Sequence, residues 1–318
     1  MNLIFCLNLF LSNFMPTGPV VSMDTTVHYF VRRFTDEDGL SQNSVKFIVP
    51  DRNGFLWLAT ENGLTRFDGN YFLNFSSDNV PALKSSRMAR IYPNDTAITV
   101  ETDIGEILTV TESTVKHIGK DMSGYSYMRY AINENDYYPI GGWPDDQAAH
   151  FGKVRPVVMP LGTDSYFAVY HDTISFIQQG KLDYRITQSR LDVSRLFVCD
   201  GRLFYLSRDG HITGWEKGQP VQVPLIGDVS SDPAFSKCKM ELFWNLAAHQ
   251  VFLYTDKNCY QLQIEPGVGI RSSVVLRDFD FHRNYISSIY YDQSERRVFP
   301  RQFYEGPLCL YQAAVQCT

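Results

Sequence analysis

The stretch DGLSQNSVKFIVPDRNGFLWLATENGLTRFDG, residues 38–69, decides the fold. It contains three short runs rich in β-branched, aliphatic and aromatic residues, at 45–49, 55–60 and 64–67. The runs are separated by turns that end in Asn-Gly, a dipeptide that readily adopts the positive φ of tight hairpin turns. This pattern predicts an antiparallel meander. Because so small a sheet is not stable alone, the meander is expected to be one unit of a repeat.

The same pattern recurs along the chain with a mean spacing of roughly 40 residues. The second strand of each unit is expected to begin near residues 55, 97, 136, 166, 202, 251 and 297. Four strands per unit at this spacing is typical of β-propeller blades. The sequence therefore predicts an all-β fold, a seven-bladed β-propeller of four-stranded antiparallel blades. The blades are expected near residues 44–75, 88–120, 125–153, 155–187, 193–225, 238–276 and 285–312.

The last unit offers three strands, at 286–291, 297–301 and 308–311, and lacks an outer strand. The segment 28–34, which contains Tyr-Phe-Val-Arg-Arg-Phe, precedes the first unit and is not used by it. We expect this N-terminal strand to pair with 308–311 and close the ring, because closure removes exposed sheet edges. Pro300 and Pro307 fall where strand and turn are expected, so the seventh blade is expected to be distorted.

Residues 3–14 are almost wholly apolar and are followed by Pro16, Gly18 and Pro19. This pattern predicts a signal peptide over residues 1–23, too short to span a bilayer, and an exported, periplasmic domain over 24–318. The alternative is a disordered or buried N-terminal strand. A net charge of −6 and the absence of a basic run argue against a nucleic-acid surface.

The six cysteines show no zinc-site spacing. Cys6 falls in the predicted leader and Cys317 in the tail. The others are scattered singly through apolar segments and are interpreted as free, buried thiols: Cys199, Cys238, Cys259 and Cys309. A disulfide between Cys238 and Cys259 is the alternative.

Residues 38–69 resemble the two-component regulator propeller repeat, and more narrowly the first blade of the sensor region of Bacteroidetes hybrid two-component regulators. The residues that carry the resemblance are Gly39, Leu40, Ser41, Asn43, Asp51, Gly54, Trp57, Gly63, Leu64, Asp68 and Gly69. Ala59 stands where this family usually has glycine. Mid-strand Trp57 is interpreted as structural, and the aspartates Asp51 and Asp68 as caps of turns.

The resemblance implies an extracytoplasmic sensor that recognises an oligosaccharide or polysaccharide fragment and controls polysaccharide utilisation. It implies contact with a neighbouring propeller or immunoglobulin-like domain, and a homodimer is a further expectation. The histidine kinase of such regulators lies in C-terminal domains outside this chain. We therefore expect no enzymatic activity from the chain itself.

No phosphate-binding loop, His-Glu-x-x-His or Gly-x-Ser-x-Gly motif occurs, and the histidines are isolated. The sequence therefore predicts no catalytic residue, no metal site and no cofactor. Two acidic pairs, Asp145 with Asp146 and Asp278 with Asp280, keep open the alternative of a carbohydrate lyase or hydrolase. A third alternative is a purely structural docking propeller.

The topology of a propeller predicts that the loops 121–127, 141–147 and 277–285 lie on one face. They carry aromatic and charged residues that suit sugar rings and hydroxyl groups: Tyr125, Tyr127, Trp143, Asp145, Asp146, His282, Arg283 and Tyr285. These residues are the predicted ligand site. For Trp143 the alternative is that its indole packs between blades.

Overall fold

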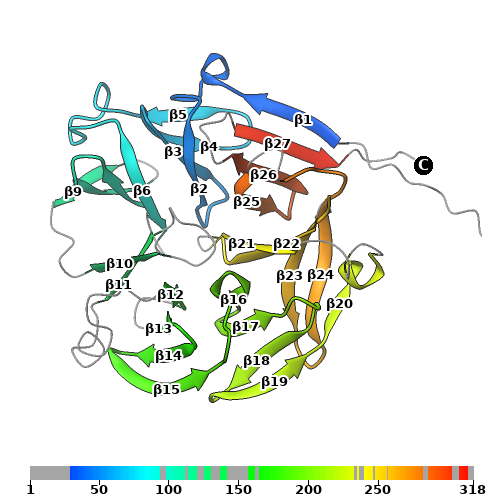
Figure 1. The fold of residues 1–318 in the computed structure, drawn as a ribbon. Helices are drawn as coiled ribbons and strands as arrows, with labels where there is room; N and C mark the ends of the chain where they lie inside the picture. The colour runs from blue at the N-terminus through cyan, green and yellow to red at the C-terminus, as the bar shows by residue number, and fades with distance from the viewer. Residues whose placement is uncertain are drawn as a thin grey trace, which may run out of the picture.

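The computed structural model describes residues 29–93, 98–111, 114–119, 125–129, 137–141, 157–161, 165–232, 235, 240–245, 248–255, 257–281, 286–302 and 308–313. Within these ranges the chain is almost entirely β-structure, and its sheets stand around a common centre (Figure 1). The helices of the described ranges are short 3-10 turns, η1 (Asp36–Asp38), η2 (Val193–Arg195) and η3 (Asp228–Ser231). None of them is long and apolar enough to span a membrane.

The sheets are numbered here in chain order, with their strands in order of pairing. Sheet one contains β2 (Val45–Pro50), β3 (Leu56–Thr60), β4 (Gly63–Phe67) and β5 (Phe72–Phe75). Sheet two contains β6 (Met88–Pro93), β7 (Ile98–Thr102), β8 (Ile107–Val110) and β9 (Val115–Gly119). Sheet three is described as the pair β10 (Tyr125–Arg129) and β11 (Tyr137–Gly141). Sheet four contains β12 (Val157–Pro160), β13 (Ser165–Tyr170), β14 (Thr173–Gln178) and β15 (Lys181–Thr187).

Sheet five contains β16 (Leu196–Cys199), β17 (Arg202–Leu206), β18 (Ile212–Glu216) and β19 (Gln219–Val223). Sheet six contains β20 (Leu225–Gly227), β24 (Gly269–Leu276), β23 (Cys259–Glu265), β22 (Gln250–Tyr254) and β21 (Glu241–Asn245). Sheet seven contains β1 (Tyr29–Phe34), β27 (Leu308–Ala313), β26 (Arg297–Gln302) and β25 (Ile286–Asp292).

The predicted all-β propeller architecture is confirmed. If β1 and the added strand β20 are left out of the count, the second strand of every sheet along the chain begins within one residue of its expected position. In Figure 1 the first strands β2, β16 and β21 lie toward the centre of the ring, and the strands β5, β19 and β24 lie toward its rim. The count of seven complete blades stays a prediction, because sheet three is described as two strands.

Apolar side chains pack between neighbouring sheets, so the second strands β3, β13 and β22 are buried on both faces. All five residues of β3 are buried, Trp57 among them. Trp57 packs in a core between sheets one and two with Leu64 and Met88. The turn after β3 needs Gly63, whose φ is 140° and whose Cβ, if present, would lie 2.9 Å from the carbonyl oxygen of Phe75. The predicted hairpin turn therefore requires glycine for two reasons: the positive φ of Gly63 and the lack of room for a Cβ.

The N-terminal strand closes the ring as predicted. In Figure 1 the blue β1 lies alongside the red β27, and the two pair antiparallel in a register that runs from Tyr29 opposite Ala313 to Phe34 opposite Leu308. Two anchors hold β1 to other sheets. Tyr29 accepts a hydrogen bond from the backbone amide of Arg277 (2.7 Å), and Phe34 is fully buried.

The distortion expected from the prolines of the seventh blade is specific to one side of β26. Pro300 lies within β26 and pairs opposite Ile289 of β25, so it does not interrupt that ladder. On the other side, the pairing of β26 with β27 includes two residue pairs and ends at Val298. Since proline has no amide hydrogen to donate, it cannot continue that ladder. As a result, β27 is paired over more residues with β1 than with its own sequence neighbour β26.

Two features of the sheets were not predicted from the sequence. β20 adds to the rim of sheet six as a parallel strand, opposite residues of β24. The inner strands of sheets seven, one and two each contain a bulge near their first residue, at Ile286/Ser288, Val45/Phe47 and Met88/Arg90. A bulge leaves one residue outside the ladder and re-aims its side chain.

Cys199 and Cys259 are buried free thiols, as predicted, and the alternative disulfide to Cys259 is not formed. Burial, with a smaller contribution from Asp200, raises the pKa of Cys199 to about 11. Cys238 lies outside the described residues, and of Cys309 the structure describes the backbone in β27.

Candidate functional site

One face of the ring is built from the segments that connect neighbouring sheets and from the turns between second and third strands. Hydrogen bonds tie these two kinds of segment together. The amide of Asp103 donates to the carbonyl of Arg87 (2.9 Å), that of Gln188 to Asp172 (2.8 Å), and that of Phe279 to Lys257 (2.9 Å). We call this surface the connection face. It is the face on which the sequence placed the ligand site.

An ion cluster lies on the connection face where sheets one and two meet. Lys46 occupies the bulge of β2, and its ammonium contacts the Glu61 carboxylate (2.6 Å) and donates to the carbonyl of Met88 (2.8 Å). Arg87 pairs with the other oxygen of Glu61. Lys46 and Glu61 are about one-fifth exposed. Partial burial opposes ionisation of Glu61, but hydrogen bonds from the two cations hold its pKa below the usual value.

This ion cluster was missed in the sequence, although one signal for it exists. Lys46 interrupts the apolar run 45–49 at a position that an ordinary inner strand would bury. Its meeting with Glu61 and Arg87 depends on the bulge and on the neighbouring sheet, neither of which the sequence shows. The cluster offers hydrogen-bonding groups in a semi-buried setting on the predicted face.

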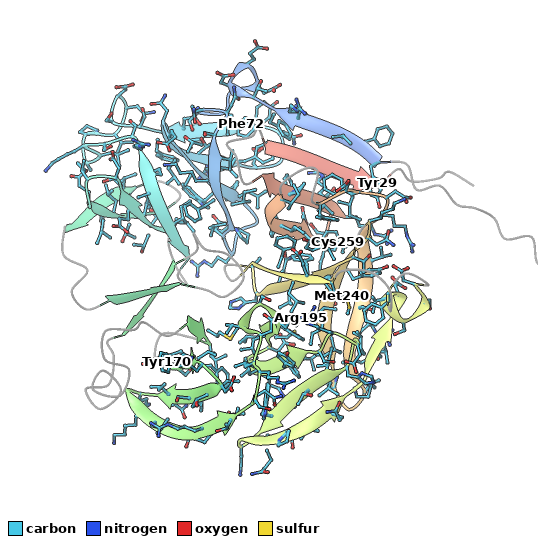
Figure 2. The ribbon with its side chains drawn as sticks, viewed as in Figure 1. Tyr29, Phe72, Tyr170, Arg195, Met240 and Cys259 are labelled. Carbon is cyan, nitrogen blue, oxygen red and sulfur yellow. The ribbon has the colours of Figure 1, made fainter. Side chains whose placement is uncertain are left out.

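A second polar region lies on the connection face over sheet five. The guanidinium of Arg195, labelled in Figure 2, donates to the carbonyls of Leu206 (3.4 Å) and Ser207 (3.3 Å). Nearby in the chain, the exposed Asp209 contacts His211 (3.0 Å) and accepts from the hydroxyl of Ser207. The bonds from Ser207 and His211 lower the pKa of Asp209 to about 2. These contacts fix the turn between β17 and β18 and the segment that leads into β16.

Part of one predicted ligand loop is described, and it is held in place. In the loop 277–285, residues 277–281 are described. Phe281 is buried against Tyr254 (ring centroids 4.9 Å apart) and Phe279 (4.8 Å). Asp278 has a φ of 53°. The described start of this loop, residues 277–281, is thus held in place by aromatic packing.

Most of the predicted ligand residues lie outside the described residues: Trp143, Asp145, Asp146, His282, Arg283 and Tyr285. Tyr125 and Tyr127 were predicted in a loop, which is wrong, because both belong to strand β10. They are two residues apart in the strand, opposite Gly141 and Pro139 of β11. Side chains two residues apart share one face of a sheet. The described backbone places both residues in one strand and does not test the complete predicted site.

The repeat-motif residues form two turn caps around sheet one. Asp51 accepts from the amides of Asn53 (2.9 Å) and Phe55 (3.0 Å), and its second oxygen accepts from the indole of Trp57 (2.8 Å). Asp68 accepts in the same way from the amides of Asn70 (2.8 Å) and Tyr71 (2.7 Å). These bonds are the capping role that was predicted for both aspartates.

A chain of hydrogen bonds attaches the Gly39–Asn43 part of the motif to sheet one. Thr65 donates to Ser41 (2.7 Å), which also bonds Thr60 (2.9 Å), and the amide group of Asn74 donates to the carbonyl of Gly39 (2.9 Å). Leu40 and Leu64 are buried. The hydrogen bonds need small polar residues and the core needs apolar ones, which explains why the two kinds stand side by side in the motif. The role of these motif residues is therefore structural.

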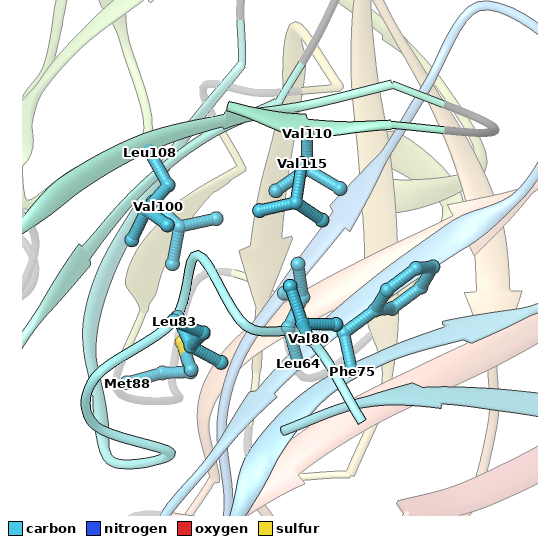
Figure 3. A pocket seen from close by; sticks show the side chains of 9 residues that line it. All are labelled: Leu64, Phe75, Val80, Leu83, Met88, Val100, Leu108, Val110 and Val115. Carbon is cyan, nitrogen blue, oxygen red and sulfur yellow. The ribbon is translucent and has the colours of Figure 1, made fainter. Parts of the chain in front are cut away.

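The described cavity at the junction of sheets one and two is apolar. Nine side chains line it, among them Leu64, Met88 and Val110, and all nine are hydrocarbon or thioether groups (Figure 3). A sugar would find no hydrogen-bonding side chain there, so this cavity is a packing defect and not the ligand site. Among the described residues no group of three metal-ligating side chains comes together.

The sheets arranged around a centre, the strands that run from centre to rim and the closure by the two chain ends define a β-propeller. A sequence model of one propeller family, described as two component regulator propeller, matches residues 39–62. The chain thus carries a two-component regulator propeller repeat, in the stretch where the resemblance was found. "Histidine kinase P4" of Formosa agariphila is 47% identical over 45 residues, which is 14% of this chain and 3% of that protein.

Solved structures resemble the whole described fold at low sequence identity. PorZ, a surface component of the type-IX secretion system of Porphyromonas gingivalis, has a TM-score of 0.51 at 12% identity and matches 91% of this chain. Extracellular domains of a hybrid and a one-component system of B. thetaiotaomicron have TM-scores of 0.48 and 0.49, at 14% and 13% identity, and match 89% and 91% of it. The chain spans 40% of PorZ and 42% and 43% of the other two.

Proposed function

We propose that this chain is the extracytoplasmic ligand-sensing propeller of a hybrid two-component regulator. The observation that carries the proposal is the repeat at residues 39–62, and a 45-residue match to a histidine kinase supports it. The short apolar segment at 3–14 supports export to the periplasm. The kinase and the DNA-binding output of such a regulator would belong to other domains of the full protein, and the signal would pass to them by domain contact.

The ligand that we propose is an oligosaccharide bound on the connection face. Three features support this choice. The face is built from rigid, hydrogen-bonded segments, which suit a preformed site. It holds charged and hydroxyl side chains, such as those around Lys46 and Arg195, which suit sugar hydroxyl groups. The predicted ligand loops add Trp143 and Tyr285, whose rings suit the C–H faces of sugars.

A thermal-shift screen of the protein against defined oligosaccharides, with sugar consumption read in the same wells, tests this proposal. A ligand that binds only the native state raises the melting temperature by mass action, by an amount that grows with its concentration. We expect a shift for at least one glycan with no consumption. Trp143→Ala should abolish the shift, and Tyr71→Ala, which removes an exposed aromatic at the rim, should keep it.

Two outcomes would contradict the proposal. Consumption of a glycan would identify a carbohydrate-active enzyme. No shift with any glycan would favour a propeller that serves only as a docking module for its neighbouring domain.

A further inference from the structure

The outermost strands of the sheets differ in how their free edges are protected. An unpaired strand edge is a template for another strand, so soluble proteins protect such edges with charges, prolines or covering segments. The rim strand β15 carries exposed Lys181, Asp183 and Arg185, and β19 carries Pro220. The edge of sheet six is covered by β20, which is held by a bond from the hydroxyl of Ser272 to the carbonyl of Ile226 (2.7 Å).

β1 also carries exposed charges, Arg32 and Arg33, but it differs from these rim strands in presenting two adjacent, strongly exposed apolar residues. It pairs with β27 on one side, and within the part of the chain that the structure describes no strand pairs with its other side. Four consecutive residues, 30–33, are exposed, so both faces of the strand are open as well as its edge. Phe30 and Val31 are 69% and 57% exposed, the two highest values among apolar strand residues whose side chains the structure describes.

The two ends of β1 are nevertheless fixed. At the start, the hydroxyl of Tyr29 accepts from the amide of Arg277 (2.7 Å). At the end, the buried ring of Phe34 packs against Phe67 (centroids 5.0 Å apart) and Phe72 (5.5 Å). Figure 2 shows Tyr29 and Phe72 at opposite ends of the strand. A strand that is anchored at both ends and open between them is a preformed platform for strand addition.

The charge of β1 indicates the kind of partner. Arg32 lies over the ring of Phe34, 4.4 Å from its centre, and Arg33 makes no ion pair within the described residues. The protein as a whole carries a net charge of −6, so these two cations form a local basic site on an acidic molecule. A second copy of β1 would bring four guanidinium groups together without a carboxylate in either strand, and like charges on opposed strands are destabilising.

We propose that the outer edge of β1 binds an extended segment of another protein in which two adjacent acidic residues stand next to two adjacent apolar ones, the order that opposes residues 30–33 on both faces of the strand. The segment adds as a further strand to sheet seven. Its backbone hydrogen bonds to the free edge of β1, its carboxylates face Arg32 and Arg33, and its apolar side chains cover Phe30 and Val31. This surface lies at the rim and is distinct from the connection face, so the two sites are independent.

Selection from a random octapeptide library on the immobilised full chain tests this inference. We expect enriched peptides in which a pair of adjacent Asp or Glu residues stands next to a pair of Val, Ile, Phe or Tyr residues. The affinity of a synthetic enriched peptide, measured by fluorescence anisotropy, should fall roughly tenfold with Arg32→Glu/Arg33→Glu, and the loss should shrink at high salt. The matched control is Lys181→Glu/Arg185→Glu on β15, which should leave the affinity unchanged.

Arg33→Glu alone provides the same test without touching the contact between Arg32 and Phe34, in case the double variant does not fold. The inference is overturned if no peptide is enriched over a bare support. It is also overturned if enriched peptides bind the β1 and β15 variants equally well. Dimers of the protein in sedimentation equilibrium that are lost with Arg33→Glu would instead make a second copy the occupant of this edge.

Discussion

At the scale of the residue, Asp51 connects the repeat motif to the core of sheet one. One carboxylate oxygen caps the turn before β3, and the other accepts from the indole of the buried Trp57. Indole has no other polar group, so the loss of this acceptor leaves a buried donor unsatisfied. The motif therefore pairs an aspartate with a tryptophan six residues later for a structural reason.

Asp51→Ala should lower the free energy of unfolding by roughly 1–3 kcal/mol, because one charged acceptor of several hydrogen bonds is removed. Chemical denaturation followed by tryptophan fluorescence measures this change. The control is Asp78→Ala, an exposed aspartate for which a change within about 0.5 kcal/mol is expected. Equal effects of the two substitutions would show that the carboxylate–indole bond has no energetic role.

Glu61 makes stability depend on pH. Its pKa in the folded protein lies below the usual 4.5, so the folded state binds its proton less tightly than the unfolded chain. Its contribution to stability is therefore fully present above that usual pKa and is lost as the pH falls through the lowered folded value. Glu61→Gln should flatten the acid limb of a plot of unfolding free energy against pH.

The control for this experiment is Glu37→Gln, an exposed glutamate of η1 that makes no ion pair within the described residues. It should keep the slope of the wild-type protein. If Glu61→Gln also keeps that slope, the cluster of Lys46, Glu61 and Arg87 does not control the acid response.

At the scale of the element, the hairpin units were predictable because their signals are local. Apolar runs alternate with turn residues, and the start of each second strand follows from that alternation. β20 was missed because it is three residues long and pairs in parallel with a strand more than 40 residues away. Tyr125 was predicted in the connecting loop 121–127, yet the strand β10 begins at this tyrosine.

The candidate site was less predictable than the fold. The topology of a propeller assigns loops to a face, and the hydrogen bonds of the connection face agree with that assignment. Which side chains meet there depends on bulges and on contacts between sheets. Lys46, for example, donates to the carbonyl of Met88 in the neighbouring sheet. Such contacts have no periodic signature in the sequence.

The strand β1 also stabilises β27, the last strand of the chain. Because the ladder between β26 and β27 ends at Val298, β27 depends on β1 for most of its pairing. Deletion of residues 29–34 should therefore release β27 and lower the melting temperature of the whole protein, as one cooperative transition. Differential scanning calorimetry measures it. A deletion variant with unchanged thermal stability would show that the N-terminal strand does not close the ring.

At the scale of the whole molecule, the chain ends are joined in one sheet, and the sheets on either side are tied to it. The amide group of Gln250 in sheet six donates to the carbonyl of Tyr291 in sheet seven (2.6 Å) and accepts from its amide (2.9 Å). On the other side, Phe299 packs in one core with Leu58 of sheet one. Ring closure of this kind restricts motion of the connection face, which the sensor role that we propose would require.

The most direct test of this closed ring is a disulfide across its seam. Arg33 lies opposite Cys309, and directly opposed residues of antiparallel strands are within reach of a disulfide. Arg33→Cys should form an intrachain bond to Cys309 under mild oxidation, identified by peptide mapping with and without reduction. Arg32→Cys, opposite Leu310 and on the other face of the strand, should not. No bond from position 33, or equal yields from both positions, would contradict the closure of the propeller by its two chain ends.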